Sequence, residues 1–457
     1  MSKFFVVHNP EAIPAAELVA FLCTAISRWY VRRDEKFYDI DRLTVRLARN
    51  DVERACIWRI GEYYPVLPVT SAIMKEALDR VITQKHNDPR ETIPVWNGSV
   101  VCSPGEPRLI WENGAVSVNK WHPPAYRGLG VTDADYGIAG RLIDRLFPRV
   151  GERAMVVNWL AWNLQNEADK PGWSVFLYSK RKGTGKSTFC TLVAKLFGED
   201  NSVTQNNVTK LTSQFNTTVL NSKLVISEEI QLRQDSNQSN SLKTLLTEKT
   251  ILAERKGMEA ERLEQRCCFL FTSNHLPTWI EADDRRYYVV EVDHEGHAAG
   301  PEAAQFSALV AAVIEQMNDP VQLAKLYNAL IAHPVPDDFN PRSLNIARDS
   351  TEVMQRLQAV SSQITVEQLE EYLNDLGEGA VPESKIVRHV REEMHLNTNS
   401  VRHMMSELGW RKEKVKWGGV DYARAIWIKP GYMVENGEVF GPEGNRNKIK
   451  DLDLYFE

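Results

Sequence analysis

The sequence predicts an α/β protein whose core is built on a phosphate-binding loop, with a mixed α+β region before it and a winged helix after it. Three apolar runs alternate with helix-forming stretches: WSVFLY (173–178), KLVISEEI (223–230) and RCCFLFTSN (266–274). A Gly-Lys-Ser motif follows the first run and leads into a helix. Such alternation of strands and helices is typical of an α/β core.

Length and composition set the outer limits. A chain of 457 residues predicts several domains. Its net charge of -6 gives no global attraction to nucleic acid, although a local basic surface is still compatible with it. None of the six cysteines forms a Cys-x-x-Cys pair, so we expect buried thiols rather than a zinc site. We expect no signal peptide and no membrane span, and therefore a cytoplasmic protein without a membrane partner.

The regions follow one another with distinct patterns. Pro14-to-Tyr30 has the pattern of an amphipathic helix, and short strands broken by glycine turns follow over 96–120. Helices are expected over 303–332, and a proline-bearing connector over 334–342. The predicted domains are an N-terminal accessory or oligomerisation domain (1–150), the nucleotide-binding core (151–300), a helical extension and linker (301–350), a winged-helix domain (351–432) and a tail (433–457).

The loop SKRKGTGKST (179–188) stands between a strand and a helix, which is the setting of a P-loop. Glycines allow backbone amides to turn around a phosphate, a lysine ammonium binds the β- and γ-phosphates, and a serine hydroxyl binds Mg²⁺. Lys180 occupies the place where the usual pattern has its first glycine, so the departure affects the start of the loop and not the GTGKST core. The expected nucleotide-binding residues are Gly183, Thr184, Gly185, Lys186, Ser187 and Thr188.

Polar residues end the next two strands. Glu228 is expected to join Ser187 in binding Mg²⁺, and Glu229 to polarise the attacking water. Asn274, with help from Thr272 or Ser273, is expected to hydrogen-bond the γ-phosphate or that water. The alternatives are an ordinary surface Glu-Glu pair and an asparagine that only caps its strand.

Two arginines open the following strand, in ADDRRYYVVEV (282–292). A guanidinium here is placed to reach the nucleotide of a neighbouring subunit and to stabilise charge on the transferring phosphoryl group. Arg286 is the first choice and Arg285 the second. A surface ion pair between Asp284 and Arg285 is the competing interpretation.

Taken in order, GTGKST, LVISEE, FTSN and DDRRYY resemble the superfamily 3 helicases, above all the helicase modules of phage, plasmid and poxvirus primase-helicases. The resemblance covers about 150–295 and implies an AAA+-like (ASCE) core that uses ATP and Mg²⁺. It also implies a ring, a hexamer of this chain, that moves 3′ to 5′ on single-stranded or forked DNA during phage or viral replication. A separate primase or polymerase is an implied partner, and residues 1–150 would serve assembly or DNA entry in the host cytoplasm.

The same resemblance implies a hairpin with a basic tip in the pore of the ring. The matching stretch is LTEKTILAERKGMEAERLEQ (246–265), with Lys256 at the tip and Arg255 and Lys249 nearby. A basic tip can hold one DNA phosphate at a time. The alternative is a charged, solvated helix, because glutamates interleave the basic residues.

Residues 382–432 have the pattern of a winged helix, with helices over 384–394 and 398–408 and strands that meet at Gly418-Gly419. Asn399, Arg402 and His403 would lie on the exposed face of the second helix. Residues 381–432 hold ten Lys or Arg against six Asp or Glu, which favours DNA contact, although winged helices also bind proteins.

Other patterns carry less weight. Asp39-x-Asp41 has the spacing of a primase metal pair, but no matching histidine and carboxylate motifs follow, so an ordinary strand or turn is favoured. The end, Asp451 to Glu457, is either a docking segment or disordered. Two other functions remain open for the whole chain: a P-loop motor for DNA packaging or remodelling, and an ATP-switched replication initiator that binds origins. A small-molecule kinase is a distant third.

Overall fold

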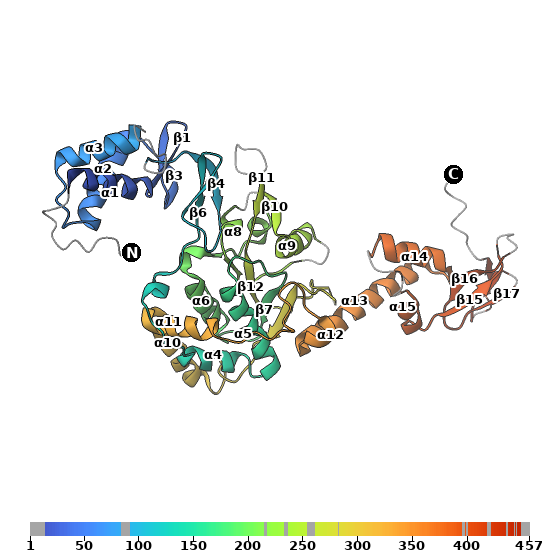
Figure 1. Ribbon diagram of the computed structural model, residues 1–457. Coiled ribbons are helices and arrows are strands. Elements are labelled where there is room, and N and C mark those ends of the chain that lie inside the picture. Colours follow the sequence, from blue (N-terminus) through green and yellow to red (C-terminus); the bar gives the residue numbers. More distant parts are fainter. Residues whose placement is uncertain are drawn as a thin grey trace. The chain divides into compact units, whose positions relative to one another are not determined.

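The fold is described from a computed structural model (Figure 1). The structure describes residues 14–83, 92–213, 217–232, 236–253, 261–281, 283–394, 398, 401–417, 422–435, 437–442, 444 and 446–448. The chain divides into two compact units. Unit 1 comprises residues 1–279 and 284–351, and unit 2 comprises 280–283 and 352–457.

A parallel sheet forms the centre of unit 1. Its strand order is β13-β7-β12-β9-β8, and every neighbouring pair is parallel. The strands are buried on both faces, which explains their unbroken apolar runs. Their bounds are β7 (Ser174–Tyr178), β8 (Ser202–Thr204), β9 (Leu224–Ser227), β12 (Cys268–Ser273) and β13 (Tyr287–Glu291).

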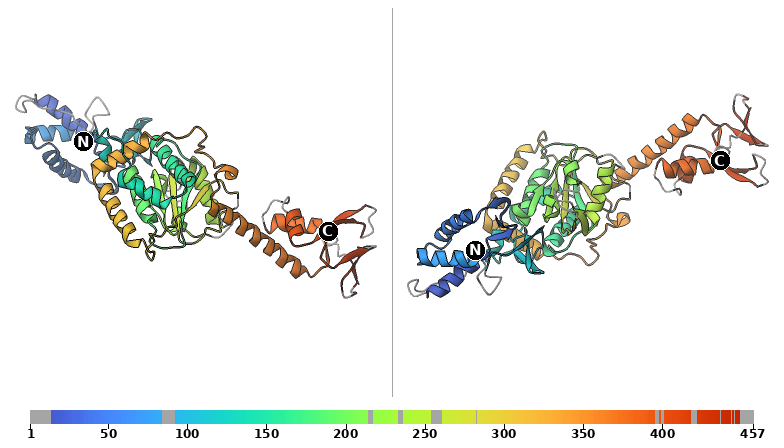
Figure 2. Two further views of the ribbon diagram at one scale, coloured as in Figure 1. Left: turned by 90° about the horizontal axis from the view of Figure 1, so that it is seen from below. Right: turned by 90° about the horizontal axis from the view of Figure 1, so that it is seen from above.

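Helices cover this sheet, and the α10–α11 pair (orange) runs beside it (Figure 2). Although α4 precedes residue 151, it packs on α10: the backbone N–H of Ala139 donates to Oε1 of Gln316 at 2.7 Å. These helices are α4 (Gly137–Leu146), α5 (Val150–Gln165), α6 (Lys186–Phe197), α10 (Ala303–Asn318) and α11 (Pro320–Ile331). The helices expected over 303–332 are thereby confirmed.

A hairpin stands between the second and third core motifs. β10 (Thr250–Ala253) pairs antiparallel with β11 (Glu261–Glu264). The helical alternative is therefore wrong over 250–253 and 261–264. The predicted tip, Arg255 and Lys256, lies outside the described residues. Short helices precede the hairpin: α7 (Val208–Leu211), α8 (Thr217–Leu220) and α9 (Asn237–Thr247).

The N-terminal part of unit 1 has its own core, in which Leu22, Cys23, Val52 and Val81 are almost fully buried. The helix expected from Pro14 is present as α1 (Ala15–Ser27). The other helices are α2 (Arg49–Tyr63) and α3 (Ser71–Thr83). One sheet holds β1 (Tyr30–Arg33), β2 (Lys36–Asp39) and β3 (Arg42–Leu47), and another holds β4 (Trp96–Val101), β5 (Leu109–Glu112) and β6 (Ala115–Asn119).

Unit 2 contains helices and strands at the predicted positions. Its helices pack around Trp427, Val390 and Met405, all buried. The elements are α13 (Glu352–Leu376), β14 (Ala380–Pro382), α14 (Glu383–Glu392), α15 (Val401–Glu407), β15 (Arg411–Val415) and β16 (Arg424–Ile428). Strands β15 and β16 pair antiparallel, and β14 adds to the other side of β16. The winged helix itself stays a prediction.

The tail expected from residue 433 is wrong as far as residue 448. Three short strands form a separate sheet there: β17 (Met433–Glu435), β18 (Glu438–Phe440) and β19 (Arg446–Lys448). Val439 is buried against Trp417 and Ile426, which gives this sheet a small apolar face. Its strands are three residues long and rich in charge, so they lack the alternation that identifies a strand in a sequence.

All six cysteines are buried and free, as the sequence predicts. In the part of the chain that the structure describes, no helix is long and apolar enough to span a membrane.

Candidate nucleotide site

The loop between β7 and α6 has a conformation that only glycine adopts easily at two positions. Gly183 and Gly185 have φ of 72° and 87°, in the left-handed region. A Cβ on Gly183 would lie 2.5 Å from Cβ of Ala298, and one on Gly185 would lie 2.8 Å from Phe306. Both the backbone and the space around the loop therefore require glycine.

Glu228 and Glu229 follow β9 and differ in their partners. The hydroxyl of Ser187 donates to Oε2 of Glu228 at 3.3 Å, and the backbone N–H of Glu228 donates to Oδ1 of Asn206 at 2.8 Å. Glu229 has φ of 56°, so the chain turns sharply at this residue. As a result the two neighbouring carboxylates face different groups.

Asn274, at the end of β12, joins the lysine to the second glutamate. Nζ of Lys186 donates to Oδ1 of Asn274 at 2.9 Å. The side-chain amide of Asn274 donates to Oε1 of Glu229, and its backbone N–H donates to Oε2 at 3.3 Å. One hydrogen-bonded chain thus joins Lys186 at the start of α6, Asn274 after β12 and Glu229 after β9 at the carboxyl edge of the sheet.

Lys186 is 7% exposed. Burial lowers the pKa of its ammonium group, while the negative charge of Glu229 opposes that shift. The carboxylates therefore keep a cation in a partly desolvated position, where its interaction with a phosphate would be stronger than in water.

A cavity of about 810 Å³ adjoins these groups. One side is formed by the loop and by Glu229, Thr272 and Asn274. The other side comes from the segment after β13 and the start of α10, and comprises Gly296, Ala298, Ala303, Ala304, Phe306, Ser307 and Val310. The expected loop residues, Gly183 through Thr188, all line it.

The sequence did not predict that residues 293–306 belong to the site. We name this segment the strap. Its contacts with the loop are a hydrogen bond from the Ala298 N–H to the Lys182 carbonyl at 3.2 Å and an ion pair between Arg181 and Asp293 at 3.4 Å. The run DHEGH (293–297) after the last core strand is unusual in composition, but it has the pattern of no nucleotide-binding motif.

Arg285 and Arg286 lie at the other edge of the sheet. β13 is parallel to β7, and the carbonyl of Arg286 accepts from the N–H of Ser174 at the beginning of β7. Arg286 pairs with the buried carboxylate of Asp284 at 3.0 Å, so the ion pair proposed between Asp284 and Arg285 is not the one found. Arg285 is exposed.

The predicted DNA contacts are only partly described. Lys249 is exposed and lies 3.9 Å from Asp169. Arg402 and His403 are exposed on α15, and His403 lies 3.8 Å from Glu407. Arg255, Lys256 and Asn399 lie outside the described residues.

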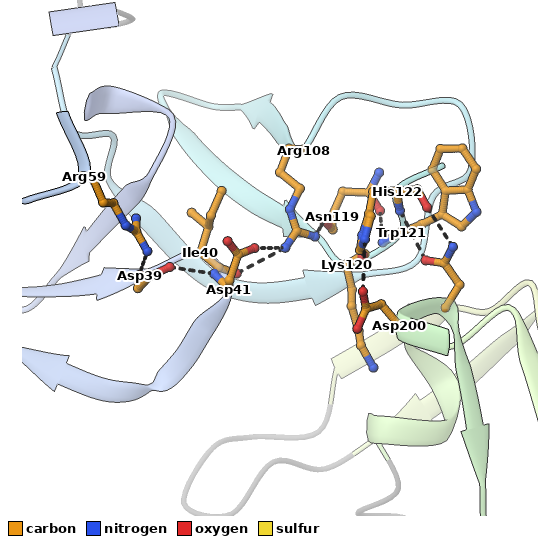
Figure 3. Close-up of polar contacts among 11 residues, drawn as sticks. Asp39, Ile40, Asp41, Arg59, Arg108, Asn119, Lys120, Trp121, His122 and Asp200 are labelled. Carbon is orange, nitrogen blue, oxygen red and sulfur yellow. Dashed lines mark hydrogen bonds and ion pairs between the residues drawn. The ribbon is translucent and has the colours of Figure 1, made fainter. Parts of the chain in front are cut away.

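Asp39 and Asp41 face different arginines (Figure 3). Asp39 pairs with Arg59, and Asp41 pairs with Arg108 at 2.6 Å. Among the described residues no group of three or more His, Cys, Asp or Glu could hold a metal ion. Asp39 ends β2 and Asp41 lies in the turn that follows, in keeping with the favoured interpretation of an ordinary strand or turn.

Comparison with known proteins identifies similar chains. Residues 177–286 match a family of unknown function (DUF5906). The DNA primase-polymerase of Nitratiruptor phage NrS-1 is 27% identical over 232 residues, which are 49% of this chain and 31% of that protein. This chain therefore matches about a third of the phage protein's length.

A solved structure has a similar fold. It is the apo structure of the NrS-1 C-terminal region (305–718), with a TM-score of 0.54 and 17% sequence identity. The match covers 90% of this chain and 99% of that one. The fold of this chain therefore extends over nearly all of that region.

Proposed function

We propose that this chain is an ATP- and Mg²⁺-dependent DNA helicase of phage or viral replication, built on an AAA+-like P-loop core. The observation that carries the proposal is the hydrogen-bonded chain Lys186–Asn274–Glu229 beside a cavity lined by the GTGKST loop. Cleavage of a γ-phosphate needs a cation, an oriented water and a carboxylate together. Similarity to a phage primase-polymerase supports the link with DNA replication.

The site residues divide the chemistry among them. Amides of the loop and the ammonium of Lys186 would bind the phosphates, and Asn274 would orient Glu229 toward the attacking water. The Ser187 hydroxyl and the Glu228 carboxylate, already 3.3 Å apart, are the hard oxygen ligands that suit Mg²⁺. Mg²⁺ bound there would neutralise charge on the phosphate oxygens.

The position of the arginines supports a ring. Arg285 and Arg286 stand at the amino edge of the sheet, roughly 16 Å along a five-residue strand from the carboxyl edge. Neither guanidinium reaches the cavity of its own chain across the sheet. Either arginine would therefore act on the nucleotide of a neighbouring protomer.

An ATP-switched initiator is the second candidate, and one contact favours it. Both carboxylate oxygens of Glu229 accept hydrogen bonds from Asn274, so this carboxylate is already engaged. A protein that keeps this arrangement with ATP bound would hold the nucleotide without repeated hydrolysis. Multiple turnovers stimulated by single-stranded DNA would exclude that candidate.

The test is ATP hydrolysis and separation of a forked duplex by the full chain, with and without single-stranded DNA. Lys256→Ala is expected to abolish strand separation while ATP hydrolysis survives, and Lys210→Ala, an exposed lysine on α7, serves as the matched control. ATP hydrolysis without strand separation by the unaltered chain would favour a packaging or remodelling motor. No hydrolysis with any DNA would contradict the proposed function.

A further inference from the structure

We infer that His294 is a positioning residue of the nucleotide site, which fixes the Thr184 peptide of the phosphate loop in its binding orientation. This inference rests on the proposed function, because it concerns the binding of a nucleotide phosphate. His294 belongs to the strap, and none of the core sequence motifs includes it.

The imidazole makes two hydrogen bonds that define its protonation. Nδ1 accepts from the backbone N–H of Gly296 at 3.1 Å. Nε2 lies 3.1 Å from the carbonyl oxygen of Thr184, which can only accept. The ring is therefore neutral, with its hydrogen on Nε2.

The bond to Thr184 sets the direction of the next amide. A trans peptide is planar, so its C=O and the following N–H point to opposite sides. When the Thr184 carbonyl is held by His294, the N–H of Gly185 points away from His294. Thr184 lies between Gly183 and Gly185, which have the most permissive backbones of the loop. A fixed Thr184 carbonyl therefore removes much of the conformational freedom of both glycines.

Packing holds the imidazole in place. Its ring centroid lies 4.5 Å from that of Phe306, at an interplanar angle of 55°. Phe306 in turn occupies the space beside Gly185. The strap thus supports the loop through a hydrogen bond at Thr184 and through apolar contact at Gly185.

The charge state of His294 links this support to pH. Burial lowers the pKa of the imidazole, the bond to Thr184 opposes that shift, Arg145 of α4 and His297 lower the pKa, and Asp293 raises it. Protonation of Nδ1 would set its new N–H against the N–H of Gly296, and this repulsion would displace the ring from its position beside Gly296 and Thr184. Nucleotide affinity is therefore expected to fall as the pH drops below the ordinary histidine range.

Two substitutions separate the two bonds. His294→Asn keeps an acceptor near the Nδ1 position but does not reach Thr184, whereas His294→Gln places an amide donor near the Nε2 position and cannot titrate. His297→Asn, on the same strap and outside the cavity lining, is the matched control. The probe is a fluorescent ribose-labelled ADP with Mg²⁺, bound to the full chain.

We expect His294→Asn to weaken binding about tenfold, and His294→Gln to stay within about threefold of the wild type. Between about pH 8 and about pH 5.5 the wild type should lose more affinity than His294→Gln. Thermal unfolding shows whether His294→Asn is folded at the assay temperature. If His294→Asn is not folded, the pH profiles of the wild type and His294→Gln test the inference instead.

Equal affinity in His294→Asn and the wild type, or parallel pH profiles for the wild type and His294→Gln, would overturn the inference alone. A wild-type chain that binds no nucleotide would overturn the proposed function, and this inference with it. If His297→Asn weakens nucleotide binding as much as His294→Asn does, the role is not specific to His294.

Discussion

The two edges of the central sheet both contain buried lysines, but their partners differ. At the carboxyl edge, Lys186 shares Asn274 with Glu229 beside a cavity. At the amino edge, Lys170 is 1% exposed and donates to the carbonyl of Cys267 at 3.2 Å. Lys223, also fully buried, donates to the carbonyls of Asp169 and Arg266. Burial alone therefore does not identify a functional lysine, whereas side-chain partners at a cavity do.

Lys186→Ala should give the largest effect. ATP turnover should fall by about a thousandfold, because the cation that faces the phosphates is lost. The melting temperature should change little, since the side chain lines a cavity and does not fill the core. Steady-state hydrolysis and thermal unfolding of the same preparation check both statements. A large loss of stability would remove the contrast between the two edges.

Glu229→Gln should also act on chemistry alone. Turnover should fall about a hundredfold, because an amide cannot accept a proton from water. Binding of ATP should persist, since the glycines of the loop and Lys186 are unchanged. Single-turnover hydrolysis, with Glu228→Gln for comparison, measures the effect. Normal hydrolysis by Glu229→Gln would show that another group polarises the water.

Lys170 should affect stability and not turnover. Burial lowers its pKa from 10.5 to about 8. Below pH 8 the folded and unfolded chains are both protonated, so the cost of burying the charge is fully present. Between pH 8 and pH 10.5 the unfolded chain binds more protons than the folded chain. The free energy of unfolding should therefore rise with pH, by up to about 3 kcal/mol.

Lys170→Met should lack this rise. Urea unfolding of both proteins near neutral pH and at about pH 9.5 gives the comparison. Parallel pH dependence in the two proteins would show that Lys170 keeps an ordinary pKa in the folded chain.

The two arginines at the amino edge should differ from each other in their effect on stability. Arg286→Ala leaves the buried Asp284 without its ion pair and should lower the free energy of unfolding by about 1–2 kcal/mol. Arg285→Ala, at an exposed side chain, should change it by less than about 0.5 kcal/mol. Denaturant unfolding compares the two. Equal losses would mean that Asp284 does not depend on Arg286.

The sequence predicted what is local. The loop, the two glutamates and Asn274 each end an apolar strand, and parallel pairing brings such ends together. What was missed depends on contacts between distant residues: nothing near His294 indicates that it meets Thr184. The small strands after residue 433 were not predicted for another reason: they are short and charged, and their residues do not alternate between apolar and polar. The pairing of Glu228 with Ser187 was predicted, whereas the left-handed turn at Glu229, which directs the second carboxylate to Asn274, was not.

That turn has a consequence for evolution and design. A left-handed conformation at a residue with a Cβ costs about 1–2 kcal/mol, and glycine would remove this cost. A Glu229→Gly chain would gain this backbone relief but would lose both hydrogen bonds from Asn274 and the charge that offsets the burial of Lys186. The strain at position 229 is therefore tied to the carboxylate itself, because the same residue supplies both the left-handed turn and the contacts with Asn274.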